Sequence, residues 1–592
     1  MILQALVKYY EMMAAEDKLP KQGYCTGKVS YALELSGEGE LCGITTLRLP
    51  VEHGKKKGDA AQLLEVPEQE SRSVNILPFF LCDNAIYLLG LDTKGNPKRA
   101  LQCFEASKKL HREILSGVDH PAARAILAFF DRWDPAAAAE NRYVKDHLAG
   151  LTAGGNLIFQ ADDQYAQGIP ALREAWEAYC AAQEQGVELP CLVTGARQPI
   201  AILHGKIRGV KDAQSVGANL VSFNSSAYES YGRDKAQGLN APVGKYAAFA
   251  YVTALNALLA NSEHRLIISD TTVVFWAESA NPDFQILFNA AMNPKEDNQK
   301  MLCAILEKIS RGLPPKEGVN PETPFYILGL APNAARLSVR FFLQDSFGNF
   351  LKHIQQHYSD MEIEKAPYEF PYLSPYWLLR ETVNPNAKDK SGSHLLSGAV
   401  MRSILTGAPY PQALMNAVML RIHAEQDDSE RHIKKITRGR AAIIKGYLIR
   451  RHRGEEEYKE FLQVSINEES KNKAYVLGRL FAILEKVQLE AYPNINTTIK
   501  DRYFTSACAT PGSVFPTLIK LSRHHIRVIK DIKLKCYLDN QIKDLIDKLD
   551  VADTPFPAHF SLEDQGSFVL GYYQQTQKRY MKKSDSDVKE EA

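Results

Sequence analysis

Alternating apolar and polar positions predict β-strands in the first two thirds of the chain. Residues 29–35 and 41–49 alternate on either side of a glycine-bearing turn, which is typical of a β-hairpin. Further strands are expected where β-branched and aromatic residues concentrate, at 85–91, 156–160, 200–204, 266–276, 325–330 and 337–343. This part of the chain is therefore expected to contain sheets.

Apolar positions three or four residues apart predict helices, which dominate the last part of the chain. Residues 100–115, 242–260 and 299–311 carry such spacing between the expected strands. The strand signal fades after about residue 395. From residue 461 onward, successive apolar stripes follow one another, the first of them formed by Leu477, Leu480, Phe481, Leu484 and Val487. We therefore predict an α+β protein, with a large mixed N-terminal body followed by a C-terminal helical bundle.

The chain length indicates several domains or one large composite body. Its 592 residues, at roughly 100–200 residues per domain, correspond to about three to five domains. We predict a mixed α/β region at 1–215 and a second at 216–460, which holds a polar, aromatic loop and a basic segment. The helical bundle is expected at 461–592, and linker-like stretches occur at 311–324 and 383–393.

Neither secretion nor membrane insertion is indicated by the sequence. The longest nearly apolar run, 246–260, is shorter than the roughly 20 residues that a bilayer-spanning helix needs. Nine cysteines are scattered without any Cys-x-x-Cys pair, which suits reduced thiols. We therefore expect a cytoplasmic protein without a membrane partner.

Known catalytic motifs are missing from the sequence. It contains no His-Glu-x-x-His and no Gly-x-Ser-x-Gly. Residues 238–246 approach a P-loop, but they have one residue too many, an internal proline, and Tyr246 where a metal-binding Ser or Thr belongs. We expect a protein that is not an enzyme and has no catalytic residue, cofactor or metal site. A divergent nuclease or an ATP-dependent remodeller of nucleic acid is the alternative.

Charge is distributed unevenly although the total nearly cancels. With 71 Lys+Arg against 70 Asp+Glu, the net charge is 71 − 70 = +1. Residues 431–454 nevertheless contain no acid and nine basic residues, namely Arg431, Lys434, Lys435, Arg438, Arg440, Lys445, Arg450, Arg451 and Arg453. A solvated helix face normally mixes the two signs, so this asymmetry predicts contact with a polyanion. A simple solvated face is the alternative interpretation.

Two further segments carry weaker binding signals. Residues 500–535 hold eight Lys or Arg against two Asp beside an apolar stripe, which fits either phosphate contact or ordinary helix solubility. Residues 219–240 combine Asn and Gln, which can pair with adenine edges, with Tyr and Phe, which can stack on unpaired bases. An ordinary loop that caps the helix expected at 242–260 is the alternative for this second segment.

Several long motifs resemble one known family. They are SFNSSAYESYG at 222–232, QGLNAPV at 237–243, AAFAYVTALN at 247–256, FLCDNAIYLLG at 80–90, DTTVVFWAE at 270–278, ILGLAPNAARLSVR at 327–340, LGRLFAILEK at 477–486, IKDRYF at 499–504 and FVLGYY at 568–573. Together they extend over nearly the whole chain, which resembles the large subunit of the type I-C CRISPR Cascade complex.

This resemblance implies a non-catalytic subunit of an RNA-guided antiviral complex. Such a subunit recognises the protospacer-adjacent motif in double-stranded target DNA, helps to open the duplex and stabilises the R-loop with its displaced single strand. The implied partners are the guide RNA with backbone and RNA-processing Cascade subunits, a small subunit that the C-terminal bundle resembles, and a recruited helicase-nuclease. The family can also translate its C-terminal part separately. With no Met between Met419 and Met581, such a product would need another start codon, for instance at Val464.

Residue chemistry suggests which side chains would contact DNA in that role. We expect the amides Asn219, Asn224, Gln237 and Asn240 to read bases and the rings of Tyr228 and Tyr231 to stack or act as a wedge. The polar stretch 52–70 is expected to be a loop whose Lys55, Lys56 and Lys57 clamp the incoming duplex. The nine basic residues of 431–454 are expected to hold backbone phosphates.

Overall fold

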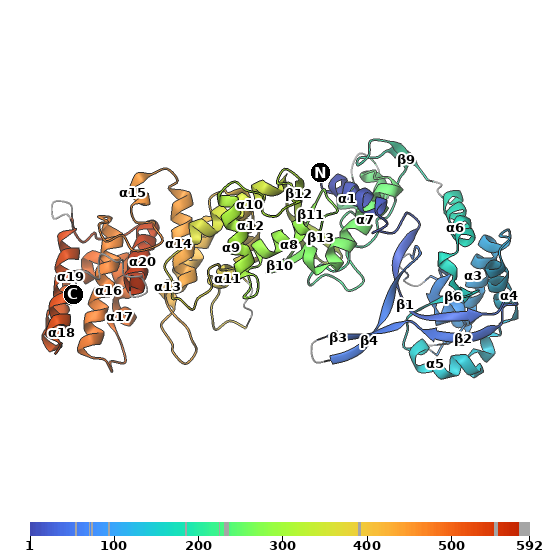
Figure 1. Ribbon diagram of the computed structural model, residues 1–592, viewed down its shortest axis with the longest axis horizontal. Helices are drawn as coiled ribbons and strands as arrows, with labels where there is room; N and C mark the ends of the chain where they lie inside the picture. Colours follow the sequence, from blue (N-terminus) through green and yellow to red (C-terminus); the bar gives the residue numbers. More distant parts are fainter. Residues whose placement is uncertain are drawn as a thin grey trace. The chain divides into compact units, whose positions relative to one another are not determined.

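The chain forms two compact units in the computed structural model (Figure 1). Unit 1 comprises Met1–Ile207 and Asn219–Ala257, and unit 2 comprises Arg208–Ala218 and Leu258–Ala592. The structure describes residues 1–53, 56–69, 72, 75–92, 95–183, 186–223, 225–229, 232, 236–388, 392–549 and 554–578. The mixed α and β content and the helical C-terminal part confirm the predicted fold class.

Unit 1 is built around a seven-stranded sheet. Its strands are β1 (Tyr24–Leu35), β2 (Leu41–Thr46), β3 (Arg48–His53), β4 (Lys56–Pro67), β5 (Cys82–Asn84), β6 (Asn156–Ala161) and β7 (Gln164–Tyr165). The order is β3-β4-β1-β6-β5, with β2 paired to β1 and β7 to β6. The long strand β1 pairs with β4 through its first half and with β2 through its second, and it runs parallel to β6. The predicted hairpin of β1 and β2 is confirmed.

Helices complete unit 1, and some of them pack against the sheet. They are α1 (Ile2–Ala15), α2 (Ala85–Leu88), α3 (Pro97–Leu115), α4 (Pro121–Arg132), α5 (Arg142–Thr152), α6 (Pro170–Ala182) and α7 (Lys245–Ala260), with short 3-10 turns at Pro135–Glu140, Ala166–Gly168, Ser226–Tyr228 and Gln237–Asn240. A two-stranded ribbon, β8 (Glu188–Pro190) and β9 (Arg197–Pro199), lies between α6 and α7 in the chain. Phe129 of α4 packs edge-on to Phe159 of β6, with ring centroids 5.6 Å apart.

Three predicted elements of unit 1 are wrong. Residues 85–91 begin with helix α2 instead of a strand, because the Asn84 side chain accepts a hydrogen bond from Ile86 N and caps a helical turn. Residues 200–204 contribute only a single bridge, between Ile200 and Gly244. The stretch 52–70 is largely strand β4, paired with β1 and β3, instead of a loop.

Unit 2 begins with an antiparallel sheet of four strands in the order β10-β11-β12-β13. The strands are β10 (Arg265–Ile268), β11 (Thr271–Ala277), β12 (Pro324–Asn333) and β13 (Arg336–Ser346), and a 3-10 turn at Ser262–His264 precedes them. The predicted strand 266–276 is thus a hairpin of two strands, because Ser269 takes a positive φ of 58° between them. All seven residues of β11 are buried, so both faces of this strand are covered.

The rest of unit 2 is helical. Its helices are α8 (Asp283–Met292), α9 (Gln299–Ser310), α10 (Phe347–Met361), α11 (Pro375–Arg380), α12 (His394–Thr406), α13 (Gln412–Ala424), α14 (Arg438–Arg451), α15 (Glu456–Lys459), α16 (Lys473–Ala491), α17 (Ile499–Ala509), α18 (Pro511–Val528), α19 (Ile532–Asp547) and α20 (Leu562–Gln577). One continuous hydrophobic core runs from the sheet to α20. The domain boundary predicted after residue 460 falls inside this unit.

Helix α16 is the centre of the C-terminal bundle and is buried along most of its length. It lies beside α20 (Figure 1), and two glycines set how closely the two backbones approach. A Cβ atom added at Gly478 would collide with the Phe568 carbonyl oxygen, and one added at Gly571 would collide with the Tyr475 carbonyl oxygen. Each glycine therefore lies directly against the main chain of the opposite helix.

Candidate nucleic-acid interface

The acid-free segment 431–454 forms helix α14 and its two flanks. The Thr437 side chain caps the helix by accepting a hydrogen bond from Arg440 N. Almost all residues from Gly439 to Leu448 are buried, so α14 is a core helix of unit 2. Its basic side chains must therefore divide between internal partners and solvent.

Arg450, near the end of α14, has a fully buried side chain. Its Nε donates to Asp360 Oδ2 at 2.6 Å, and its Nη1 donates to the carbonyl oxygens of Ser403 at 2.6 Å and Ala408 at 2.9 Å. The guanidinium also lies 4.2 Å from the ring centroid of Tyr410. Burial, with a smaller contribution from Arg450, lowers the pKa of His357 to about 3, which keeps this imidazole neutral beside the cation.

Three more cations of the segment point inward. Arg440 pairs with Glu425 at 2.6 Å and with Glu381 at 3.3 Å. Lys435 Nζ donates to the Ile422 carbonyl oxygen at 2.8 Å. Lys445 Nζ donates to the Asp360 carbonyl oxygen at 3.2 Å, and burial lowers its pKa to about 8.

This burial corrects part of the sequence prediction. Lys435, Arg440, Lys445 and Arg450 are each at most 3% exposed, so they are not positioned to bind DNA phosphates. Buried charges need partners because desolvation is costly, and these cations have carboxylates or backbone carbonyls. The asymmetry of charge in the sequence arises because the compensating acids lie on other segments of unit 2.

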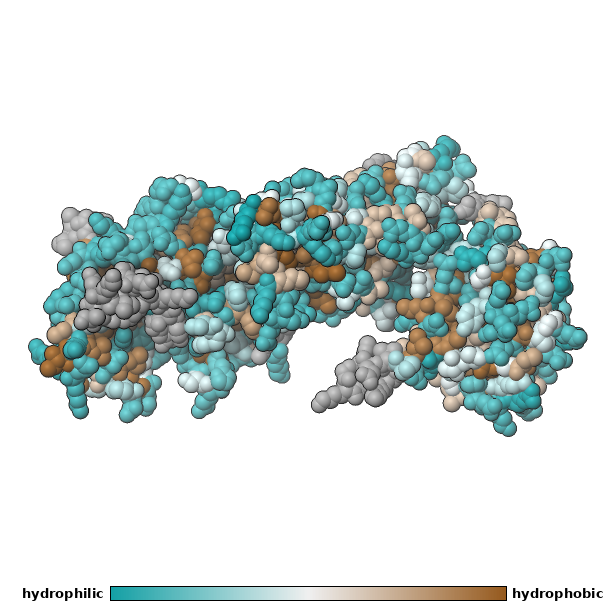
Figure 2. All heavy atoms as spheres, viewed as in Figure 1, coloured by the Kyte–Doolittle hydropathy of each residue, from teal (hydrophilic) through white to brown (hydrophobic). Residues whose placement is uncertain are grey.

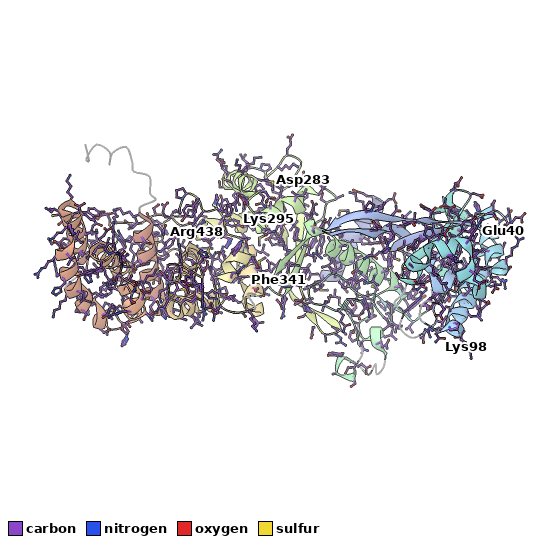
Figure 3. The ribbon with its side chains drawn as sticks, turned by 90° about the horizontal axis from the view of Figure 1, so that it is seen from below. Glu40, Lys98, Asp283, Lys295, Phe341 and Arg438 are labelled. Carbon is purple, nitrogen blue, oxygen red and sulfur yellow. The ribbon has the colours of Figure 1, made fainter. Side chains whose placement is uncertain are left out.

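The other basic residues of the segment are more accessible. Arg431, Lys434, Arg451 and Arg453 are exposed, and they remain candidates for phosphate contact. Arg438, labelled in Figure 3, is half-buried and donates to the carbonyl oxygens of Phe370 and Pro371. Arg438 therefore stabilises the position of the segment that contains Phe370 and Pro371.

Helix α18 presents a more continuous basic surface. Phe515, Leu518 and Ile526 bury one face of the helix, while Lys520, Arg523 and Arg527, spaced by three or four residues, are exposed on the other. Arg523 forms an ion pair with Asp539 at 3.0 Å. Lys530, between the two helices, and Lys533, in the first turn of α19, continue this run of exposed basic residues. We call Lys520, Arg523, Arg527, Lys530 and Lys533 the α18 row.

Figure 2 shows both hydrophilic and hydrophobic side chains on the visible surface of the C-terminal helices, the hydrophilic ones covering the larger part. Lys500, which the sequence analysis grouped with the second basic region, is instead 9% exposed and pairs with Asp427 at 2.7 Å. The second basic region thus also contains an internal cation, but most of its charge faces solvent.

The polar, aromatic segment of unit 1 is partly used to hold its own loop. Asn219 Nδ2 donates to the His204 carbonyl oxygen at 3.0 Å, and Asn240 Nδ2 donates to the Gln237 carbonyl oxygen at 3.0 Å. Tyr228 is half exposed at the end of a 3-10 turn. Asn224 and Tyr231 lie outside the described residues.

The three lysines expected to clamp the duplex are placed only in part. Lys56 and Lys57 belong to the backbone of strand β4, opposite His53 and Glu52. Lys55 and the side chains of all three lysines lie outside the described part of the chain. A clamping role for them stays a prediction.

An exposed aromatic segment was missed by the sequence analysis. Tyr368, Phe370, Tyr376 and Trp377 all have exposed side chains within ten residues of unit 2. One of them, Tyr376, lines a hollow of about 450 Å³ together with β10 and the end of α8. The density of aromatic residues in YEFPYLSPYW at 368–377 was the available signal.

The described residues contain neither a metal-binding cluster nor a membrane-spanning helix. No group of three or more His, Cys, Asp or Glu side chains is arranged to hold a metal ion among the residues that the structure describes. Within the same residues, no helix combines the length and the hydropathy needed to cross a bilayer.

Comparison with known protein families gives a match over nearly the whole chain. The family model described as CRISPR-associated protein (Cas_Csd1) matches residues 6–580. No curated protein matches the sequence. The family match covers both compact units and includes the basic helices and the polar, aromatic segment described above.

Proposed function

The chain belongs to the Cas_Csd1 family of CRISPR-associated proteins, and from this premise we propose that it is the non-catalytic large subunit of a type I-C Cascade complex. Membership makes it a component of a Cascade-type complex; the subtype and the tasks below are our proposal. The family match over residues 6–580 is the observation that carries it.

In this role the protein recognises the protospacer-adjacent motif in double-stranded DNA and helps to open the duplex. Base pairing by the guide RNA then reads the target sequence, while the protein stabilises the R-loop and its displaced strand. The backbone, RNA-processing and small subunits are its partners in the complex, and it supports recruitment of the helicase-nuclease that cleaves DNA.

The α18 row supports contact with the DNA backbone. Lys520, Arg523 and Arg527 lie on one face of α18, and Lys530 and Lys533 follow them in the chain. Among the described residues, only Arg523 of this row has a carboxylate within ion-pair distance. Such a row attracts phosphates irrespective of sequence, with an affinity that falls as salt rises. Arg431, Lys434, Arg451 and Arg453 supply a second accessible group.

The loop of unit 1 is our proposed reader of the motif. Asn219 uses one amide N–H to hold His204, so its second N–H and its oxygen can still pair with a base. Gln237 has a positive φ of 45° at the start of its 3-10 turn, close to the exposed ring of Tyr228 in the sequence. Asn224, Tyr231 and Asn240 complete the proposed set.

The test compares DNA binding by the assembled complex across a library of flanking motifs. Replacing Gln237 with Ala should relax the preference for one motif, at about 1–3 kcal/mol for each base that the side chain no longer reads. Gln164→Ala, which alters an exposed glutamine of β7 in the same unit, is the matched control. Equal weakening on all motifs would remove Gln237 from the readers, and metal- or ATP-dependent turnover by the isolated protein would contradict the non-catalytic role.

A further inference from the structure

The segment 368–377 concentrates exposed aromatic side chains in unit 2. Tyr368 is 81% exposed, Phe370 48%, Tyr376 45% and Trp377 54%. Large aromatic side chains gathered at a surface are typical of a binding site, because their burial against a partner releases much water. The question is which partner these rings fit.

Helix α11 holds two of these rings in a fixed arrangement. The Ser374 side chain caps the helix through Trp377 N, and Leu378 and Leu379 anchor it, each 3% exposed. The rings of Tyr376 and Trp377 lie edge to face, with centroids 5.8 Å apart. The Arg380 guanidinium is 5.0 Å from the Trp377 ring centroid and 6.0 Å from that of Tyr376. A cation thus lies beside two exposed ring surfaces.

The hollow that Tyr376 lines adds further cations. Arg265 and Lys295 are both part of its wall, and Lys295, labelled in Figure 3, lies three residues after the end of α8. Among the described residues, neither Lys295 nor Arg380 has a carboxylate within ion-pair distance; the adjacent Glu381 pairs with Arg440 instead. Among the described residues that line the hollow, Glu263 is the one acid. Positive charge therefore predominates around the rings.

We propose that Trp377 and Tyr376 form a stacking platform for unpaired bases of single-stranded nucleic acid. Phosphates of the same strand would contact Arg380 and Lys295. Every base presents a flat face to an aromatic ring, so such a site binds without sequence preference, and the adjacent cations hold the backbone. If the proposed function holds, the displaced strand of the R-loop is the source of this single strand.

The test uses the full-length chain and an oligothymidylate of roughly 15 nucleotides. Stacking should quench the fluorescence of Trp377, and the background emission of Trp133, Trp176 and Trp276 is measured in the Trp377→Phe variant. Replacing Trp377 with Ala should weaken binding of the labelled oligonucleotide roughly 5- to 150-fold, the range expected when one base is no longer stacked. Trp377→Phe should keep most of the affinity and lose the quenching.

The control is Leu101→Ala, which removes a similarly exposed apolar side chain from α3 in unit 1. Unchanged oligonucleotide affinity for Trp377→Ala would overturn the platform, and so would unchanged fluorescence on titration of the wild type. Loss of association with other Cascade subunits, at unchanged oligonucleotide affinity, would assign the rings to a protein interface and also overturn it. Failure of the complex to bind motif-bearing duplex contradicts the proposed function alone.

Discussion

Helices α14 and α18 are both rich in lysine and arginine, but they direct these side chains to opposite environments. In α14, Arg440, Lys445 and Arg450 point into unit 2 and meet carboxylates or carbonyl oxygens. In α18, the basic side chains lie on the face opposite to the apolar stripe and are exposed. The comparison teaches that a high density of basic residues indicates DNA contact only when these residues lie on a solvent-exposed face of the helix.

The largest effect is expected from breaking the internal ion pair of α14. Replacing Arg450 with Ala leaves the Asp360 carboxylate, with a side chain 3% exposed, without its cation. The free energy of unfolding should fall by about 3–5 kcal/mol, as measured by urea denaturation. Arg453→Ala, an exposed neighbour, should stay within about 0.5 kcal/mol of the wild type. Equal effects of the two substitutions would contradict the internal role of Arg450.

The pH dependence of stability should distinguish the buried lysine of α14 from an exposed lysine of α18. Burial lowers the pKa of Lys445 to about 8 from its ordinary 10.5. Between these values the unfolded chain binds a proton that the folded chain does not, so stability rises with pH by up to about 3 kcal/mol. Lys445→Met should lack this gain in unfolding measurements at pH 7 and pH 10, whereas Lys520→Met should retain it. A constant difference between wild type and Lys445→Met would disprove the assignment.

Neutralising α18 should affect binding and spare stability. The triple substitution Lys520→Gln, Arg523→Gln and Arg527→Gln should leave unfolding nearly unchanged, because exposed pairs contribute only about 0–1 kcal/mol. DNA affinity should fall, and the dependence of log K on log salt should become shallower by up to about 2.7. Fluorescence anisotropy at several salt concentrations measures both.

The matched control for α18 changes the same charge in unit 1. Replacing Lys108, Arg112 and Arg124 with Gln removes three positive charges, as the α18 variant does. These three side chains are paired with Asp131 or Asp119, and they lie in the other unit. If this control weakened DNA binding as much as the α18 variant, the effect would come from total charge and the α18 row would not be an interface.

The smallest effect is expected at the exposed end of α14. Replacing Arg451 and Arg453 with Gln should weaken DNA binding on every sequence and make the salt dependence shallower by at most about 1.8. Arg451 is already 3.6 Å from Glu563, which reduces its expected share. Unchanged affinity and unchanged salt dependence would restrict DNA contact to other parts of the protein.

The sequence predicts the fold class and many elements because apolar periodicity is a local signal. The stripe of Leu477, Leu480 and Phe481 is buried in α16, as expected. Local capping was the signal overlooked at Asn84, where a polar side chain starts a helix inside an apolar run. Strand β4 was missed because its polar residues concealed the pairing with β1 and β3.

The candidate site is less predictable because burial depends on distant residues. The acids that neutralise α14 are Asp360, Glu381 and Glu425, and Asp360 precedes Arg450 by 90 positions in the sequence. No local pattern can reveal these pairs. Asn219 was expected to read bases, yet its amide also holds His204, a contact that only the folded loop creates.

The close contact between α16 and α20 at these two glycines also has a consequence for folding during synthesis, because the bundle core needs both helices. Gly478 and Gly571 lie against the opposite main chain, so each helix completes the surface of the other. They are separated by 571 − 478 = 93 positions, which take roughly 5–20 seconds to translate. During synthesis the apolar sides of α16 therefore stay uncovered until α20 has been made, and the bundle gains its complete core only then.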